Sequence, residues 1–209
     1  MKLILFPPYC YQEGTSHLGK RKTKSHALSF LKRFKRELGK NEVETLNMSE
    51  IKELTTETEL ENSVKVIGDS FMTVAAEFNL NNENCPTHPS LVTMKQLTEM
   101  KRKGLKLFGL FEYDAQVGFV AVEKKKHKVY SLEKLAVLPE HRHKGYGGKL
   151  IEFAEGYVKN SKGEKLSIGI INEHAVLKKW YEAKGFKETA VMKFEHLPFT
   201  VCFMEKTIG

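Results

Sequence analysis

The segment LEKLAVLPEHRHKGYGGKLIEFAEGY, residues 132–157, decides how the rest of this 209-residue sequence is organised. Its apolar run at residues 135–138 predicts a buried strand that ends at Pro139, because proline cannot donate a hydrogen bond to a neighbouring strand. Apolar residues return at helical spacing from Leu150 to Val158. The predicted order is therefore strand, glycine-rich turn and helix.

The turn between this strand and this helix predicts an anion site. Glycines at positions 145, 147 and 148 let backbone N–H groups approach a ligand closely, and the first N–H groups of a helix have no partner within it. Such a site suits phosphate. Two common phosphate motifs do not fit, because Lys149 is followed by Leu150 instead of Ser or Thr, and the glycine spacing is not GxGxxG. The alternative is an ordinary strand-to-helix turn.

The same run matches the pattern [RQ]xxGx[GA], with Arg142, Gly145 and Gly147 in register after the step Val137-Leu138-Pro139. It resembles motif A of the GCN5-related N-acetyltransferase (GNAT) superfamily, in which this turn holds the pyrophosphate of acetyl-coenzyme A. The resemblance implies acetyl-CoA as cosubstrate. It also implies coenzyme contacts from the strand and the turn, at Leu135, Ala136, Val137, Arg142, His143, Lys144, Gly145, Tyr146, Gly147 and Gly148.

The apolar periodicity from residue 50 onward predicts the order β-α-α-β-β-β-α-β-α-β-β. This order is similar to the GNAT acyl-CoA N-acyltransferase fold, an α/β (α+β) fold whose central, mostly antiparallel mixed sheet is flanked by helices. Besides the helix of the opening segment, helices are expected over 59–78, 91–103 and 174–184. Strands are expected over 48–54, 105–113, 117–125, 129–137, 165–171, 186–194 and 199–206.

Residues 79–90 are rich in Asn and Pro and predict a loop. In the superfamily, the region between the first two helices helps to form the acceptor site, so the resemblance places Asn84, Cys85 and His88 near the substrate. A nucleophile or a metal pair is an alternative for Cys85 and His88. One Cys and one His are too few ligands for zinc, however, and a loop conformation fixed by the neighbouring prolines is the favoured interpretation.

Residues 1–47 differ in charge from the rest of the chain. They hold ten Lys/Arg and four Asp/Glu, which is +6 of the net charge of +8. We expect a basic N-terminal extension at 1–47, with an amphipathic helix over 25–38, and the acetyltransferase domain at 48–209. Such a helix could contact an acidic surface, a membrane or a partner, or pack on its own domain; Met48 as the effective start is a further alternative. The position of the charge gives no reason to expect nucleic-acid binding by the main domain.

The three cysteines are widely spaced and odd in number, which indicates neither a disulfide framework nor a zinc site. No metal is therefore expected, and a reducing, cytoplasmic compartment is favoured. No apolar run approaches the roughly 18 residues of a spanning helix. The sequence leaves a homodimer open.

Glu133 is the predicted catalytic carboxylate. A period of two residues would place it on the same strand face as Leu135 and Val137, beside the glycine turn. The local pattern Leu132-Glu133-x-x-x-Val137-x-Pro139 resembles that of aminoglycoside N-acetyltransferases, in which the glutamate handles the acceptor amine. The alternative is a solvated charge beside a lysine.

Tyr181 is the second predicted catalytic residue. The run Trp180-Tyr181-Glu182-Ala183-Lys184-Gly185-Phe186 resembles the superfamily's YexxGF signature, which implies that Tyr181 protonates the leaving thiolate. A tyrosine that only packs in the core is the alternative. The superfamily usually carries Asn seven residues earlier, where this chain has His174. His174 and the nearest asparagine, Asn172, are both candidates for coenzyme contact, and for both the alternative is a helix N-cap.

No serine or cysteine nucleophile stands out, so the sequence predicts direct attack of a primary amine on acetyl-CoA in a ternary complex. The acceptor amine is not identified by any motif. A non-catalytic CoA-binding sensor or interaction module with the same fold is the alternative function.

Overall fold

The computed structural model describes residues 49–209. The predicted N-terminal extension, its basic helix and the start at Met48 lie outside the described residues. The second helix begins at Met94, three residues later than predicted, and residues 89–91 form a separate 3-10 turn. The elements are β1 (Ser49–Glu53), α3 (Glu57–Glu77), η1 (Pro89–Leu91), α4 (Met94–Arg102), β2 (Lys106–Glu112), β3 (Ala115–Lys124), β4 (Val129–Val137), η2 (Pro139–His141), α5 (Tyr146–Asn160), β5 (Lys165–Ile171), α6 (Ala175–Ala183), β6 (Lys187–Lys193) and β7 (Thr200–Thr207).

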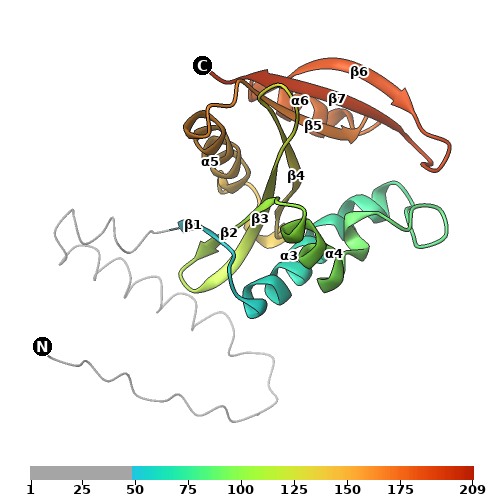
Figure 1. The fold of residues 1–209 in the computed structure, drawn as a ribbon. Coiled ribbons are helices and arrows are strands. Elements are labelled where there is room, and N and C mark those ends of the chain that lie inside the picture. The colour runs from blue at the N-terminus through green and yellow to red at the C-terminus, as the bar shows by residue number, and fades with distance from the viewer. Residues whose placement is uncertain (1–48) are drawn as a thin grey trace, which may run out of the picture. The chain divides into compact units, whose positions relative to one another are not determined.

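Within the described residues, seven strands form one sheet in the order β1-β2-β3-β4-β5-β7-β6 (Figure 1). The central pair, β4 and β5, is parallel, and the other neighbouring pairs are antiparallel. The predicted mixed, mostly antiparallel sheet flanked by helices is therefore confirmed.

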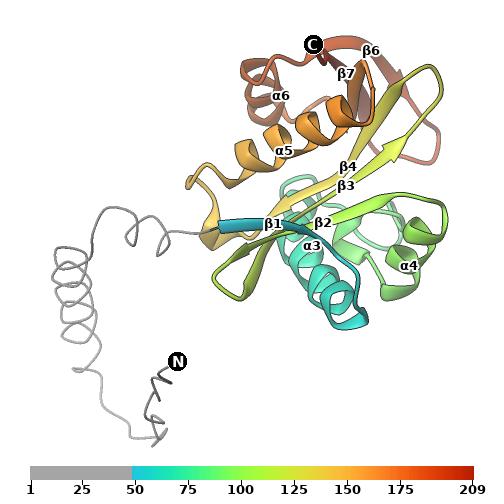
Figure 2. The same ribbon diagram turned by 60° about the vertical axis from the view of Figure 1, so that its left-hand side comes forward.

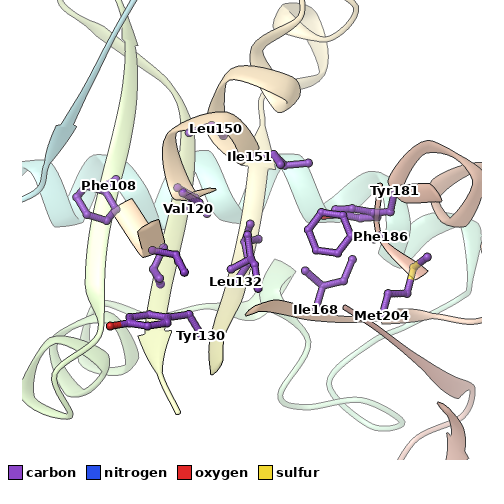
Figure 3. Close-up of a cluster of buried hydrophobic side chains, with 14 of the residues drawn as sticks. Phe108, Val120, Tyr130, Leu132, Leu150, Ile151, Ile168, Tyr181, Phe186 and Met204 are labelled. Atoms are coloured by element: carbon purple, nitrogen blue, oxygen red, sulfur yellow. The ribbon is translucent and has the colours of Figure 1, made fainter. Parts of the chain in front are cut away.

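Helices cover both faces of this sheet (Figure 2). On one face, α5 buries Leu150 and Ile151 against the strands, where they pack in a core that also includes residues of α6 (Figure 3). On the other face, Ile67 of α3 and Leu97 of α4 pack against Phe119 of β3. Among the helices between residues 49 and 209, none combines the length and the hydropathy that a membrane crossing requires.

A bulge interrupts β4. Phe119 of β3 pairs with Ala136, whereas Ala121 pairs with Glu133, so two residues of β4 stand opposite one residue of β3. Lys134, the first of these two, has a φ of +52°, which is a strained conformation for a residue with a side chain. A bulge leaves the extra residue unpaired and redirects the side chains around it.

The bulge shows that the predicted face of Glu133 is wrong. Its cross-strand partner Ala121 and the later Ala136 both belong to the core under α3 and α4. Leu135 and Val137 instead pack with the core under α5. One extra residue reverses the alternation of side chains along a strand. Glu133 therefore lies on the face toward α3.

The parallel pair β4–β5 is short. Only residues 129–131 of β4 pair with residues 165–167 of β5, although both strands continue. Beyond these pairs the two strands separate, and backbone groups on the facing edges have no strand partner. This separation opens the sheet in its middle.

The start of α3 predicts a dependence of stability on pH. Glu59 accepts hydrogen bonds from the backbone N–H groups of Thr56 (3.0 Å) and Thr55 (2.9 Å). These bonds, with a contact from Lys52, lower the pKa of Glu59 to about 2. Its pKa in an unfolded chain is about 4.3, so the stabilisation is present above that pH and is lost as the pH falls toward 2. We expect Glu59→Gln to flatten the fall in the free energy of unfolding between about pH 5 and pH 3, measured by urea denaturation.

Glu61→Gln is the matched control, because Glu61 is an exposed residue of the same helix. It should keep the slope of the native protein. An unchanged slope in Glu59→Gln would contradict the contribution of the backbone hydrogen bonds that Glu59 accepts at the start of α3.

Candidate active site

A cavity of about 530 Å³ lies where β4 and β5 separate. Residues 132–135 of β4 and 168–171 of β5 line it, and α3 and α6 contribute further walls. Five of the predicted site residues line this one cavity: Glu133, Leu135, Arg142, His174 and Tyr181. The other predicted residues do not line it, namely Ala136, Val137, His143, Lys144, Gly145, Tyr146, Gly147, Gly148 and Asn172.

Glu133 is held by a neighbour that the sequence reasoning missed. Ser131 Oγ donates a hydrogen bond of 2.6 Å to Glu133 Oε1. The spacing of two residues along a strand could have suggested this contact, because such residues share a face. Glu133 Oε2 makes no hydrogen bond or ion pair with any residue between 49 and 209, so one carboxylate oxygen is oriented and the other is free for a ligand.

Tyr181 is almost fully buried and still lines the cavity from α6. Its ring packs edge-on against Trp180 and Phe186, with ring centroids 4.8 and 5.5 Å apart (Figure 3). Its hydroxyl makes no hydrogen bond with the described part of the chain. Burial raises the pKa of the Tyr181 phenol well above its ordinary value. The group therefore keeps its proton and can act as a donor.

The structure separates the two candidates near the start of α6. His174 lines the cavity, caps α6 by accepting a 3.4 Å hydrogen bond from the N–H of Leu177, and lies 3.8 Å from a carboxylate oxygen of Glu77. The amide oxygen of Asn172 accepts a hydrogen bond from Lys178 at 3.2 Å. His174 thus faces the cavity, whereas the amide oxygen of Asn172 is engaged with α6.

The glycine turn leaves its N–H groups without a side-chain partner. Side chains cap α3, α4 and α6, but none caps α5, whose N-cap is Gly145 at a φ of +83°. The first N–H groups of α5, at residues 146–148, are therefore available to a ligand. An anion fits at such a helix N-terminus, so the turn is suited to a pyrophosphate.

Two side chains from the α6 region lie beside this turn. A Cβ built at Gly147 would meet the Trp180 ring at 3.1 Å, and one built at Gly148 would meet Lys184 Nζ at 3.0 Å. Gly147 therefore allows the close approach of the Trp180 ring, whereas a side chain at position 148 would require only a small shift of the flexible Lys184 side chain. Lys184 adds a positive charge at the turn that the motif did not predict, because the two segments meet only in the folded chain.

Arg142 ties the turn to α3. Its Nη2 donates to the carbonyl oxygen of Ser70 (2.8 Å) and to Thr73 Oγ1 (3.0 Å), and its Nε donates to the carbonyl oxygen of Val137 (3.2 Å). Its backbone N–H bonds to the carbonyl oxygen of Pro139. The side chain therefore positions the turn, and its contact with a coenzyme stays a prediction.

Glu112, at the end of β2, holds the side chains of the turn. Tyr146 donates a 2.5 Å hydrogen bond to Glu112 Oε1, while His141 Nδ1 and Lys144 Nζ lie 2.8 and 3.3 Å from Oε2. Burial, followed by the bond to Glu112, raises the pKa of Tyr146 to about 12. These side chains point back to β2, which leaves the backbone of the turn to face a ligand.

We expect Tyr146→Phe to lower the free energy of unfolding by roughly 1.5–3 kcal/mol, because it removes a hydrogen bond to a charged group. Urea denaturation measures the change. Tyr130→Phe is the matched control, since the Tyr130 hydroxyl makes a longer, 3.3 Å bond to the neutral carbonyl of Ser161. It should cost only about 0.5–1.5 kcal/mol. Equal losses in the two variants would contradict the importance of Glu112.

Of the three residues predicted near the acceptor, Asn84, Cys85 and His88, only His88 lines the cavity. Cys85 is buried in a small separate core, and burial raises the pKa of its thiol. The Asn84 side chain bonds to the carbonyl oxygen of Asn79 and the N–H of Asn81 within the loop. Residues 49–209 contain no group of three or more His, Cys, Asp or Glu side chains placed to hold a metal ion.

Comparisons with known proteins agree with this geometry. Residues 104–188 match the family model of the acetyltransferase (GNAT) domain. No curated protein matches the sequence. Among solved structures, the ribosomal-protein-S18-alanine N-acetyltransferase of Escherichia coli is 17% identical with a TM-score of 0.62, and the match covers 78% of this chain and 95% of that one. The PaiA N-acetyltransferase of Thermoplasma acidophilum, solved with coenzyme A, is 20% identical with a TM-score of 0.61, covering 77% and 99%.

The ribosomal-protein-alanine N-acetyltransferase of Brucella melitensis is similar to the same extent, with 18% identity, a TM-score of 0.59 and coverage of 76% of this chain and 99% of that one. At these identities the structures show a shared fold. The matched sequence segment contains the strand, the glycine turn and α5, and it ends just after the YexxGF-like run. The two comparisons agree: residues 104–188 match the acetyltransferase (GNAT) domain, and the described residues share the fold of the GNAT acetyltransferases.

Proposed function

We propose that the protein transfers an acetyl group from acetyl-CoA to a primary amine. One observation carries the proposal: the free oxygen of Glu133 and the unpartnered hydroxyl of Tyr181 belong to residues that line a single cavity, at the gap between β4 and β5. A carboxylate and a phenol that keeps its proton are the base and the acid that acetyl transfer to an amine requires.

The coenzyme would bind along the gap in the sheet. The uncapped N–H groups at residues 146–148 and the ammonium of Lys184 would hold its pyrophosphate. The β4 backbone at residues 135–137, which has no partner on the β5 side, would bind the acyl arm and stabilise the oxyanion that develops on the carbonyl. His174 is the favoured side-chain contact from α6, because it lines the cavity.

The thioester supplies the acetyl group and the leaving thiolate. An alkyl ammonium with a pKa near 10 must lose a proton before it can attack, which costs roughly 4 kcal/mol at neutral pH. Glu133 accepts that proton, directly or through water. The amine nitrogen forms a bond to the carbonyl carbon, the C–S bond breaks, and Tyr181 protonates the thiolate. The second proton of the attacking nitrogen is lost through water, which restores the proton of the Tyr181 phenol. Transfer is direct, and the buried thiol of Cys85 takes no part.

A cytoplasmic location is part of the same proposal. Cys85 and Cys202 are both free thiols in the described residues. Free thiols persist where the redox poise is reducing, which supports the cytoplasm, where acetyl-CoA would be supplied.

Two measurements on the full chain test the function. Trp180 is the single tryptophan of the chain and packs beside Gly147, so its fluorescence should change when coenzyme A binds. Release of free thiol from acetyl-CoA, measured over a panel of primary amines, reports turnover. Coenzyme binding together with turnover on at least one amine supports the enzyme. Binding without turnover on any amine would instead favour a non-catalytic coenzyme-binding module.

A further inference from the structure

Lys134 places a partly buried cation at the cavity. It lies in the β4 bulge and lines both the active-site cavity and a second cavity of about 580 Å³ beside η1 and α4. Its ammonium makes no hydrogen bond or ion pair with any residue between 49 and 209. Burial lowers the pKa of Lys134, and the neighbouring charge of Glu133 opposes that effect. A cation removed from water without a partner is unfavourable, so this site is suited to an anion.

His88 presents a second donor to the same region. Its Nδ1 accepts the backbone N–H of Ser90 at 3.3 Å and lies 2.9 Å from Ser90 Oγ, which can also donate to it. With Nδ1 as the acceptor, the ring proton of the neutral side chain is on Nε2. Burial, followed by the charge of Lys134, lowers the pKa of His88, which keeps the ring neutral. The Nε2–H has no acceptor among the described residues, and His88 lines both cavities as Lys134 does.

The other charged side chains that line the active-site cavity, Arg142 and Glu77, have partners or are exposed to solvent. Arg142 is bound to α3 and to the carbonyl of Val137. Glu77, on α3, is more than half exposed and lies near His174. Two charged groups of the cavity lining therefore remain without a partner in the described residues. One is the free carboxylate oxygen of Glu133, and the other is the ammonium of the next residue, Lys134.

We propose that the acceptor is a small aminocarboxylate, whose amine binds at Glu133 and whose carboxylate binds Lys134 Nζ and His88 Nε2–H. This inference rests on the proposed function and adds the class of acceptor. Because both charged residues line the same cavity, we expect an acceptor whose amine and carboxylate lie only a few bonds apart, as in an α-amino acid. A polyamine fits less well, because its second ammonium would meet the charge of Lys134 in a site of low dielectric constant.

Matched pairs of acceptors test the class with the native protein. Glycine and β-alanine are compared with their carboxamides, and diamines of similar length complete the set. Each pair keeps the amine and removes the negative charge. We expect kcat/KM for each carboxylate to exceed that for its amide by at least about tenfold, which is the usual gain from a charged hydrogen bond.

Variants locate the effect at Lys134. Lys134→Met keeps an unbranched side chain in the bulge and removes the charge, so the preference for carboxylates should fall to less than about twofold. Lys134→Arg should restore most of it. Lys126→Met is the matched control, because Lys126 is an exposed lysine in the turn between β3 and β4, and it should keep the full preference.

A binding measurement tests the carboxylate subsite without requiring turnover of any acceptor. N-acetylglycine and N-acetylglycinamide represent the two product types, and their affinities for the native, coenzyme A-loaded protein are measured by calorimetry. Tighter binding of the carboxylate, lost in Lys134→Met, supports the subsite even if no acceptor is turned over. Turnover with equal or greater preference for amides or diamines overturns the aminocarboxylate class and leaves the acetyltransferase function intact. Equal affinities for the two acetylated compounds overturn the subsite as well.

Discussion

Tyr181→Phe is expected to lower kcat on the order of 10²-fold while the affinity for coenzyme A stays nearly the same. The change removes one hydroxyl and keeps the ring, so the edge-on packing against Trp180 and Phe186 is retained. The hydroxyl makes no hydrogen bond with the described residues, so its removal leaves no buried donor or acceptor unsatisfied there. The loss therefore reports the proton donated to the leaving thiolate, not damage to the fold.

The pH dependence gives this prediction a second readout. Because burial raises the pKa of Tyr181, the phenol stays protonated throughout the range in which most enzymes are assayed. The native rate should accordingly show no fall with rising pH near 10, the ordinary pKa of tyrosine. A fall there that disappears in Tyr181→Phe would contradict the raised pKa.

Tyr157→Phe serves as the control for the kinetic test. Tyr157 is a partly buried tyrosine of α5 that packs against Phe108, away from the cavity lining. It should keep native turnover. If Tyr181→Phe also keeps native turnover with normal thiol release, Tyr181 is a core residue and another group supplies the proton.

The parts of the fold that the sequence predicted are those encoded locally. The strand, glycine turn and helix around Gly145 follow from a proline, three glycines and an apolar repeat within one stretch, and the order of elements follows from similar short patterns. Each pattern concerns residues that are neighbours in the chain. The family resemblance then supplied the pairing of the elements into a mixed sheet, which no local pattern contains.

The bulge in β4 could not be predicted from local sequence patterns. The run from Leu132 to Val137 is compatible with regular alternation, and only the pairing with β3 reveals an extra residue. That residue moved Glu133 to the face toward α3 and placed Lys134 at the cavity. The extra residue reverses which face of the sheet the following side chains of β4 occupy. The face assigned to Glu133 from a period of two residues was therefore wrong.

Contacts between segments that are distant in the sequence could not be predicted from local patterns either. Arg142 is held by Ser70, 72 positions earlier, and Tyr146 by Glu112, 34 positions earlier. The motif indicated that the turn is basic, but it could not indicate that a carboxylate on β2 binds its side chains. Lys184 joins the turn for the same reason, because α6 packs beside the start of α5 only in the folded protein.

Glu133→Gln is expected to lower kcat/KM for a primary amine on the order of 10²-fold near pH 7, and the deficit should shrink as the pH rises. The amide keeps an oxygen that can accept the 2.6 Å hydrogen bond from Ser131, so the side chain stays oriented. What it loses is the ability to take the proton of the acceptor ammonium.

The rate deficit of Glu133→Gln should shrink with rising pH because the acceptor amine itself loses its proton. For an amine with a pKa near 10, the neutral fraction rises about tenfold for each unit of pH below that value. A variant without the base depends on this fraction alone, so its rate should climb steeply with pH while the native rate changes less. Glu123→Gln removes a partly exposed carboxylate of β3 that pairs with Lys125, and it should keep the native profile. A deficit in Glu133→Gln that is constant from pH 6 to 10 would mean that Glu133 binds the acceptor without accepting its proton, and native rates across that range would remove it from the mechanism.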